Sequence, residues 1–158
     1  MDMPLHPAWV KNISRRVLWA ALEKDISKAD RLAMEAFFEK KCAYCEGPLA
    51  ARWHADHLLS VDSGGFNHVS NRVPACPRCN EHEKREMAWL EFLEWKCGTD
   101  TNLIKIRKER IERWTASRKY PKPPVTEEQR QAWKTEVENL AKAIDAAWGR
   151  LRNKGLGD

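Results

Sequence analysis

Four of the five cysteines form two CxxC pairs, a spacing that is typical of metal-binding knuckles. Cys42 and Cys45 lie in "CAYC", and Cys76 and Cys79 lie in "CPRC". Two such pairs complete a tetrahedral zinc site, with Zn–S bonds of about 2.3 Å and no open position, so the predicted zinc is structural. One CxxC pair could instead be a redox centre, but two pairs without a βαβ pattern favour zinc. Cys97 has no partner in this scheme.

Three residues near the cysteine pairs offer a carboxylate, an imidazole and an amide. Asp56 and His57 are adjacent at the end of a strand-like run, and Asn80 follows the last cysteine of the pairs. Such groups can support metal-assisted phosphodiester hydrolysis, in which an ion neutralises phosphate charge and a neutral imidazole deprotonates water. Each also has a simpler interpretation: Asp56 could cap a turn, His57 could lie in the core, and Asn80 could cap a helix.

The order CxxC, "ADHLLSVDSGG", "NRVPACPRCN" resembles the HNH nucleases of the four-cysteine zinc type, which have the ββα-metal fold. The resemblance covers about residues 42–84. It implies that Asp56 binds a divalent ion and that the neighbouring His57 is the general base. It also implies that Asn71 holds the loop and orients the base, and that Asn80 completes the metal site.

Two details near the end of this motif differ from the family pattern. The family often has a lysine three residues after the last metal ligand, where this chain has Glu83, with Lys84 following. His82 is an alternative ligand to Asn80. The implied catalytic ion is Mg²⁺ or Mn²⁺, since these hard cations prefer oxygen ligands. Three arginines could stabilise charge in the transition state or lie on the surface: Arg72, Arg78 and Arg85.

Basic residues are concentrated after the cysteine-rich segment. Residues 98–122 carry eight Lys and Arg side chains against three Asp and Glu. This excess indicates a polyanionic partner such as DNA, although a solvated helix face is an equally weighted alternative. Phosphate contacts of this kind give affinity and little sequence specificity. The predicted nucleic-acid-binding residues are Lys105, Arg107, Lys108, Arg110, Arg113, Arg118 and Lys119.

The hydrophobic pattern predicts a mostly α-helical chain with a small zinc-stapled ββα-metal hairpin (α+β), flanked by helices on both sides. Ser27 with Asp30 and Thr126 are expected N-caps, and the second helix is expected to bury Leu32, Ala36 and Phe37. Helices are predicted at about 8–24, 28–40, 81–96, 101–118 and 126–152, and strands at about 53–59 and 71–74. The chain is therefore predicted to divide into three segments: 1–41 (N-terminal helices), 42–97 (nuclease core) and 98–158 (basic helix, Pro-rich break and C-terminal amphipathic helix).

The C-terminal helix carries an apolar seam close to a heptad repeat. This seam could pack on the rest of its own chain, or it could pair two chains in a homodimer. No apolar run reaches the roughly 18 residues of a membrane span, and the cysteine pairs favour a reducing cytoplasm in a bacterial or phage setting.

Three functions remain for this sequence. The first is an HNH endonuclease that nicks or breaks DNA in a phage, restriction or defence setting. The second is a non-catalytic zinc-stapled nucleic-acid-binding module, and the third is an adaptor that binds partners through its last helix.

Overall fold

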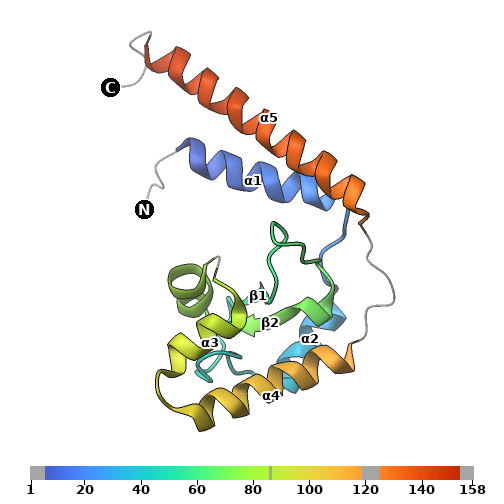
Figure 1. Cartoon of the computed structure of the whole chain (residues 1–158), viewed down its shortest axis with the longest axis vertical. Helices are drawn as coiled ribbons and strands as arrows, with labels where there is room; N and C mark the ends of the chain where they lie inside the picture. The colour runs from blue at the N-terminus through green and yellow to red at the C-terminus, as the bar shows by residue number, and fades with distance from the viewer. Residues whose placement is uncertain (1–5, 86, 119–124, 154–158) are drawn as a thin grey trace. The chain divides into compact units, whose positions relative to one another are not determined.

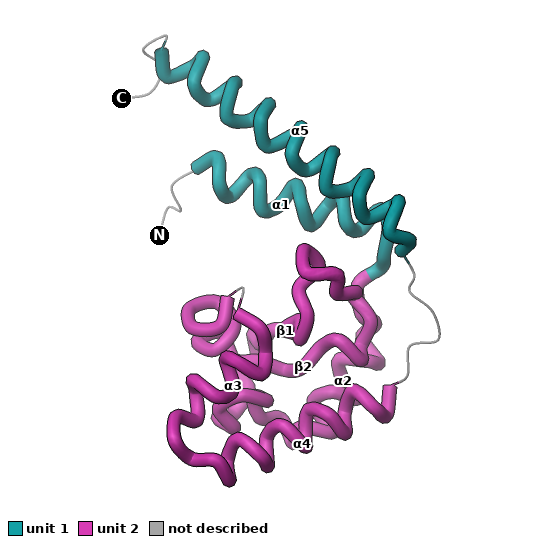
Figure 2. Tube along the Cα trace, viewed as in Figure 1, with its two compact units in different colours: residues 1–24, 124–158 teal, residues 25–123 magenta. Residues whose placement is uncertain are grey.

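The structure is a computed structural model that describes residues 6–85, 87–118 and 125–153. Two compact units divide the chain (Figure 2). Residues 25–123 form the cysteine unit, which contains all five cysteines, and residues 1–24 with 124–158 form the helical unit. The three predicted segments do not coincide with these units, because helices on both sides of the cysteine-rich segment belong with it. None of the described helices combines the length and the apolar content of a membrane span.

The helical unit consists of α1 (Pro7–Ala20) and α5 (Glu127–Arg152), which lie along each other (Figure 1). The ring of Trp19 meets that of Trp133 edge-on with 5.0 Å between centroids. The Arg130 guanidinium lies over the Trp19 ring at 5.0 Å, which adds a cation–π contact. The two ends of the chain are therefore joined by aromatic packing near one end of the helix pair.

Only part of the apolar seam of α5 is used inside the helical unit. Trp133 is buried, whereas Leu140, Trp148 and Leu151 are exposed. Pairing between two copies of the chain stays a prediction. Thr126 begins α5 with a capping box, in which its hydroxyl accepts from the Gln129 N–H, so the predicted N-cap is confirmed.

The cysteine unit is built around a two-stranded antiparallel hairpin whose register places Asp56 opposite Val73 and His57 opposite Arg72. The strands lie within the predicted ranges to one or two residues, and the expected mostly helical chain with a small ββα hairpin is confirmed. Its elements, in chain order, are α2 (Lys28–Phe37), β1 (His54–His57), η1 (Val69–Asn71), β2 (Arg72–Ala75), η2 (Arg78–Lys84), α3 (Trp89–Cys97) and α4 (Thr101–Ser117).

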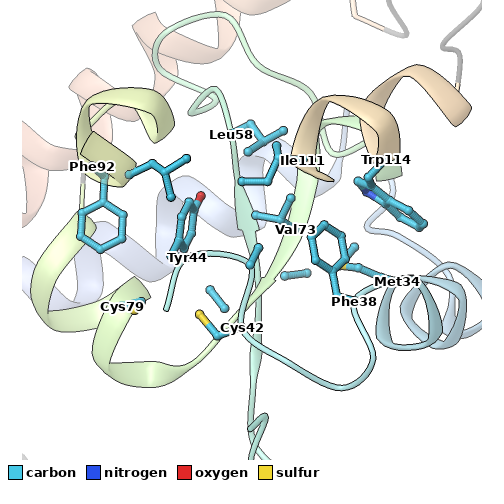
Figure 3. Packing of buried hydrophobic residues seen from close by; sticks show 14 of the residues in the cluster. Met34, Phe38, Cys42, Tyr44, Leu58, Val73, Cys79, Phe92, Ile111 and Trp114 are labelled. Atoms are coloured by element: carbon cyan, nitrogen blue, oxygen red, sulfur yellow. The ribbon is translucent and has the colours of Figure 1, made fainter. Parts of the chain in front are cut away.

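The core of this unit lies between the hairpin and the surrounding helices (Figure 3). Trp114 of α4 is fully buried, and its indole N–H lies 2.8 Å from the carbonyl oxygen of Arg72 and 3.3 Å from that of Val69. One side chain thus satisfies two backbone acceptors at the start of β2 and fixes α4 against the hairpin. The other largest buried hydrophobic side chains are Met34, Phe38, Tyr44, Val73, Phe92, Leu93 and Ile111.

Helix α2 begins as predicted but buries a different face. Ser27 and Asp30 form a capping box, with the Asp30 N–H donating to the Ser27 hydroxyl at 3.1 Å. Met34 is fully buried, whereas Leu32, which was expected in the core, is 56% exposed. The expectation for Leu32 was wrong because α2 packs through Met34 and the adjoining Phe38.

The predicted helix 81–96 is two elements. η2 is a π-helix, and the Arg85 N–H donates to the carbonyl oxygen of Asn80, five residues back, at 3.4 Å. Arg85 then takes a positive φ of 48°, and regular helix resumes at Trp89. Segments of this wider turn are rare and are often found at functional sites.

Candidate functional site

The two CxxC pairs meet at one point, and the Sγ atoms of Cys42, Cys45, Cys76 and Cys79 all lie within 4.8 Å of one another. Cys42 and Cys79 are buried, and the other two are partly buried. The donor set fits Zn²⁺, which takes four thiolates in structural sites. Cys97 lies outside the cluster, and its Sγ accepts from Arg107 at 3.2 Å.

Hydrogen bonds among the sulfurs couple their ionisation: those with Cys42 and Cys79 lower the pKa of Cys45, whereas the pKa values of Cys42 and Cys79 rise. The hydrogen bond with Cys45 raises the pKa of Cys42 to about 11, and contacts with Cys42 and Cys45 also raise the pKa of Cys79. Several thiolates at this spacing repel one another unless a cation lies among them. A divalent zinc ion supplies that charge and would also join the two ends of the segment 42–79.

Asp56 lies on β1 with both carboxylate oxygens engaged. The Tyr44 hydroxyl donates to Oδ2 at 2.6 Å, and Lys84 Nζ lies 3.1 Å from Oδ2 and 3.4 Å from Oδ1. Burial raises the pKa of Asp56, while the charge of Lys84 and the Tyr44 hydrogen bond lower it. Burial also raises the pKa of Tyr44, so the phenol keeps the proton that it donates. Together these contacts orient the carboxylate and favour its charged form.

His57 follows Asp56 but has different neighbours. Its Nε2 lies 3.0 Å from Oδ1 of Asn67, in the loop between the strands. Burial lowers the pKa of His57 to about 3, and the positive charge of Arg72 contributes in the same direction. The imidazole is consequently neutral at physiological pH, which is the form that a general base requires.

The low pKa of His57 has a measurable consequence. We expect the ring to stay neutral as pH falls from 8 to about 5, because protonation in the folded state is displaced to about pH 3. In the unfolded chain the ring ionises near its ordinary pKa of 6.5, so this histidine makes the folded state less stable as pH falls below 6.5. Histidine NMR signals recorded against pH would test the prediction. A midpoint near 6.5 for His57 would contradict it.

The side chain of Asn71 holds the loop that contains Asn67, the residue that contacts His57. Its Oδ1 accepts from the Leu59 N–H at 2.9 Å, and its Nδ2 donates to the carbonyl oxygens of Leu59 at 2.8 Å and Phe66 at 2.9 Å. These three bonds join both ends of the loop. The residue that contacts His57 is Asn67, whereas these three bonds of the Asn71 side chain go to the loop backbone.

Gly65 lies where the same loop passes closest to itself. A Cβ at this position would meet the Leu59 carbonyl oxygen at 1.8 Å and Asn71 Nδ2 at 2.8 Å. We therefore expect Gly65→Ala to break the Asn71 bonds and to lower the free energy of unfolding by about 1–3 kcal/mol. Denaturant titration of the zinc-loaded chain measures the change. Gly149→Ala, where a Cβ meets open space, is the control and should be neutral or stabilising.

Asn80 and His82 lie on η2, which contacts β1 through two other side chains. Lys84 reaches Asp56, and Glu81 Oε1 lies 3.0 Å from His54 Nε2 on the same strand. The backbone N–H of Asn80 donates to the carbonyl oxygen of Cys76 at 3.0 Å, which links this residue to the cysteine cluster. His82 is exposed. Their roles as ligands of a catalytic ion stay predictions.

The three arginines near the motif lie in different settings. Arg72 is buried, and its guanidinium donates to the carbonyl oxygen of Ala55 at 2.7 Å. Arg78 is exposed and pairs with Glu83 at 2.7 Å, and Arg85 is exposed after η2. Arg72 therefore belongs to the interior of the site, next to His57.

The predicted phosphate-binding residues of α4 fall into two groups. Arg107 donates to the carbonyl oxygen of Tyr44 at 2.7 Å, and Arg110 donates to that of Phe37 at 3.2 Å. Both guanidinium groups also lie within 4 Å of Glu46. These two arginines hold α4 against the rest of the unit.

The remaining members of that set are more accessible. Lys105 and Arg113 are exposed, and Lys108 is partly exposed. The Arg118 guanidinium lies 4.8 Å from the centre of the Trp114 ring. Lys119 lies outside the described residues. Nucleic-acid binding by this helix stays a prediction, with Lys105 and Arg113 as its most accessible cations.

Sequence reasoning missed three members of the site: Tyr44, Asn67 and Lys84. Tyr44 lies inside the first CxxC pair, and its contact with Asp56 spans 12 residues. Lys84 lies one position after the place where the family pattern has its lysine, yet its side chain reaches Asp56 from the π-helix. The displaced lysine was a signal that could have identified this residue.

Comparison with known proteins gives two matches for this part of the chain. Residues 42–86 match the model of the family described as HNH endonuclease. A Bacillus subtilis (strain 168) protein named "SPbeta prophage-derived putative HNH endonuclease YoqL" is 31% identical over 90 residues. That match covers 49% of this chain and 36% of the relative, so the chain spans about a third of the length of that protein. No solved structure matches the chain significantly. With the four-cysteine cluster and the ββα hairpin, residues 42–86 form a domain of the HNH endonuclease family.

Proposed function

We propose that this protein is a metal-dependent endonuclease that hydrolyses phosphodiester bonds in DNA. The observation that carries the proposal is the pair Asp56 and His57 on one strand of the HNH-family domain, a buried carboxylate beside a partly buried, neutral imidazole. The description of the prophage relative as an endonuclease supports the same reaction class.

In this proposal each residue of the site has a separate task. Asp56 and Asn80 provide oxygen ligands for one Mg²⁺ or Mn²⁺ ion, with His82 as the alternative to Asn80. When bound, the ion would neutralise charge on the scissile phosphate and the leaving 3′-oxygen. His57 takes the proton from the attacking water, and the products carry a 5′-phosphate and a 3′-hydroxyl. Tyr44 and Lys84 orient Asp56 and favour its charged form against the opposing effect of burial.

The carboxylate of Asp56 fits such an ion. Asp56 Oδ2 receives the short bonds from Tyr44 and Lys84, whereas the contact of Oδ1 with Lys84 is longer, 3.4 Å. An ionised carboxylate has about four lone-pair positions, so Oδ1 can accept a further ligand. Oxygen donors suit Mg²⁺ and Mn²⁺, whereas the four sulfurs suit zinc. Each metal is therefore expected at the site whose donor atoms it prefers.

Supercoiled plasmid offers a direct test of the proposed reaction. The zinc-loaded chain is incubated with plasmid and Mg²⁺ or Mn²⁺, and nicked and linear products are quantified. Cleavage should stop when EDTA is added briefly, before the zinc content falls. Asp56→Asn should reduce cleavage in either metal because it removes one anionic ligand. Retarded migration of DNA without cleavage would favour a non-catalytic binding module.

The number of strands cut depends on the state of the exposed seam on α5. A monomer would release nicked plasmid, and a dimer with two sites could release linear plasmid. Sedimentation of the full chain, combined with the ratio of nicked to linear product, distinguishes these outcomes.

A further inference from the structure

The loop between β1 and β2 brings a second asparagine to the proposed base. Asn67 is buried, and its Oδ1 lies 3.0 Å from Nε2 of His57. The same oxygen lies 2.5 Å from a terminal nitrogen of Arg72. One amide oxygen is therefore shared by the imidazole and a guanidinium.

The guanidinium decides which atom of the Asn67 amide faces the imidazole. Arginine carries only donors, so the atom beside it must be an acceptor. The reversed amide would place its NH₂ group against the NH₂ of Arg72, which is unfavourable. The carbonyl oxygen of Asn67 thus points at His57, and the ring must present an N–H at Nε2 to make this contact.

Arg72 is itself held by the hairpin. It stands opposite His57 in the register of the two strands. It donates to the carbonyl oxygen of Ala55 at 2.7 Å, and its other terminal nitrogen lies 3.3 Å from Asp25 Oδ1. The strand pairing that positions His57 therefore also positions the group that orients Asn67.

We propose that Asn67, oriented by Arg72, is a positioning residue that fixes the Nε2–H tautomer of His57 and leaves Nδ1 as the basic nitrogen. In the reaction a water O–H bond breaks and the proton forms a new N–H bond at Nδ1. The water oxygen forms a bond to phosphorus as the bond between phosphorus and the 3′-oxygen breaks, and the leaving 3′-oxygen takes a proton from solvent water. Nε2 keeps its proton throughout, and Asn67 then accepts from a charged ring, which strengthens the bond. The role in cleavage rests on the proposed function, whereas the tautomer does not.

The tautomer can be measured without substrate. Long-range ¹H–¹⁵N correlation of the full, zinc-loaded chain with ¹⁵N-labelled histidine, near neutral pH, reports which ring nitrogen carries the proton. We expect a pyridine-type Nδ1 and a pyrrole-type Nε2 for His57. A wild-type ring protonated at Nδ1 would overturn the inference.

Two variants of Asn67 separate its acceptor from its volume. Asn67→Asp keeps an oxygen at the same place and should keep the Nε2–H tautomer. Asn67→Leu has similar size and no acceptor, and its spectrum should contain the other tautomer. Ser63→Ala is the control: Ser63 bonds to Ser60 within the loop, and its replacement should leave the spectrum of His57 unchanged. If Asn67→Leu retains zinc and the pure Nε2–H form, the inference fails.

Plasmid cleavage gives the second readout. Asn67→Leu should lower kcat about 10- to 100-fold with little change in KM, and Asn67→Asp should recover part of the loss. If Asn67→Leu does not fold, the wild-type and Asn67→Asp spectra still decide the tautomer. Correct tautomer without any DNA cleavage would reject the proposed function alone. Cleavage by an enzyme whose His57 is protonated at Nδ1 would reject the positioning role alone.

Discussion

Replacing His57 with alanine is expected to lower the rate of plasmid cleavage by about 100- to 10,000-fold, the range for loss of a general base. The imidazole is the neutral, partly buried group next to Asp56, and alanine cannot take a proton from water. Initial rates of nicking in Mg²⁺ and in Mn²⁺ measure the loss. Zinc content and melting temperature should show that the variant still folds.

A matched histidine control isolates the effect. His6 accepts from the Ala8 N–H at the start of α1, in the helical unit. His6→Ala should cleave plasmid at the rate of the unchanged chain. If His57→Ala cleaved equally fast, the assignment of His57 as base would be wrong, and the activity would have to come from another group.

Replacing Cys79 with serine should have the largest effect on stability. The Cys79 side chain is fully buried, and its sulfur is one of only four in the cluster. Zinc binding contributes roughly 10–16 kcal/mol in small zinc-finger peptides, which matches or exceeds the whole stability of a typical domain. We expect the cysteine unit to lose zinc and its cooperative thermal transition, as measured by metal analysis and near-UV circular dichroism.

Cys97→Ser provides the comparison for that variant. Cys97 is the fifth cysteine and lies outside the cluster. The serine variant should bind one zinc ion per chain and melt close to the unchanged protein. A Cys79→Ser chain with full zinc content and an unchanged melting curve would contradict a structural four-thiolate site.

The parts of this protein that the sequence predicts are those set by neighbours along the chain. The CxxC spacing identified the cluster, and Ser27 with Asp30 marked the start of α2 because capping needs residues only three apart. The hairpin was predicted because the turn-prone run "SVDSGGFNH" joins two strand-like segments at about 53–59 and 71–74. Interactions between residues that are close in the sequence can form whatever the tertiary arrangement, so the sequence alone predicts them.

Other features depend on contacts between distant residues, and these were missed. The prediction that α2 buries Leu32 was wrong. The positions of the elements that pack against α2, and not the hydrophobic period of its own sequence, determine that Met34 is the buried residue. Arg107 and Arg110 were read as solvent-facing cations, yet they bond to backbone carbonyls 63 and 73 residues away. The pairing of α1 with α5 likewise joins the two ends of the chain.

The break after η2 was hidden for a different reason. Met87 precedes α3 yet continues the helical spacing of Leu90 and Leu93, so the apolar pattern does not mark the residue at which α3 begins. Arg85, with its positive φ, carries no sequence mark of the kind that glycine would give. The displaced Lys84 was the one local sign that this turn is unusual.

Zinc bound to the four sulfurs would close the backbone between the two cysteine pairs into a loop. With zinc bound, Cys42 and Cys45 hold one side and Cys76 and Cys79 the other, and the exposed residues Asp62 and Ser63 lie between. A protease that nicks the backbone there would produce two fragments, each keeping two ligands and one strand of the hairpin. With zinc bound, the two fragments should migrate together in a native gel.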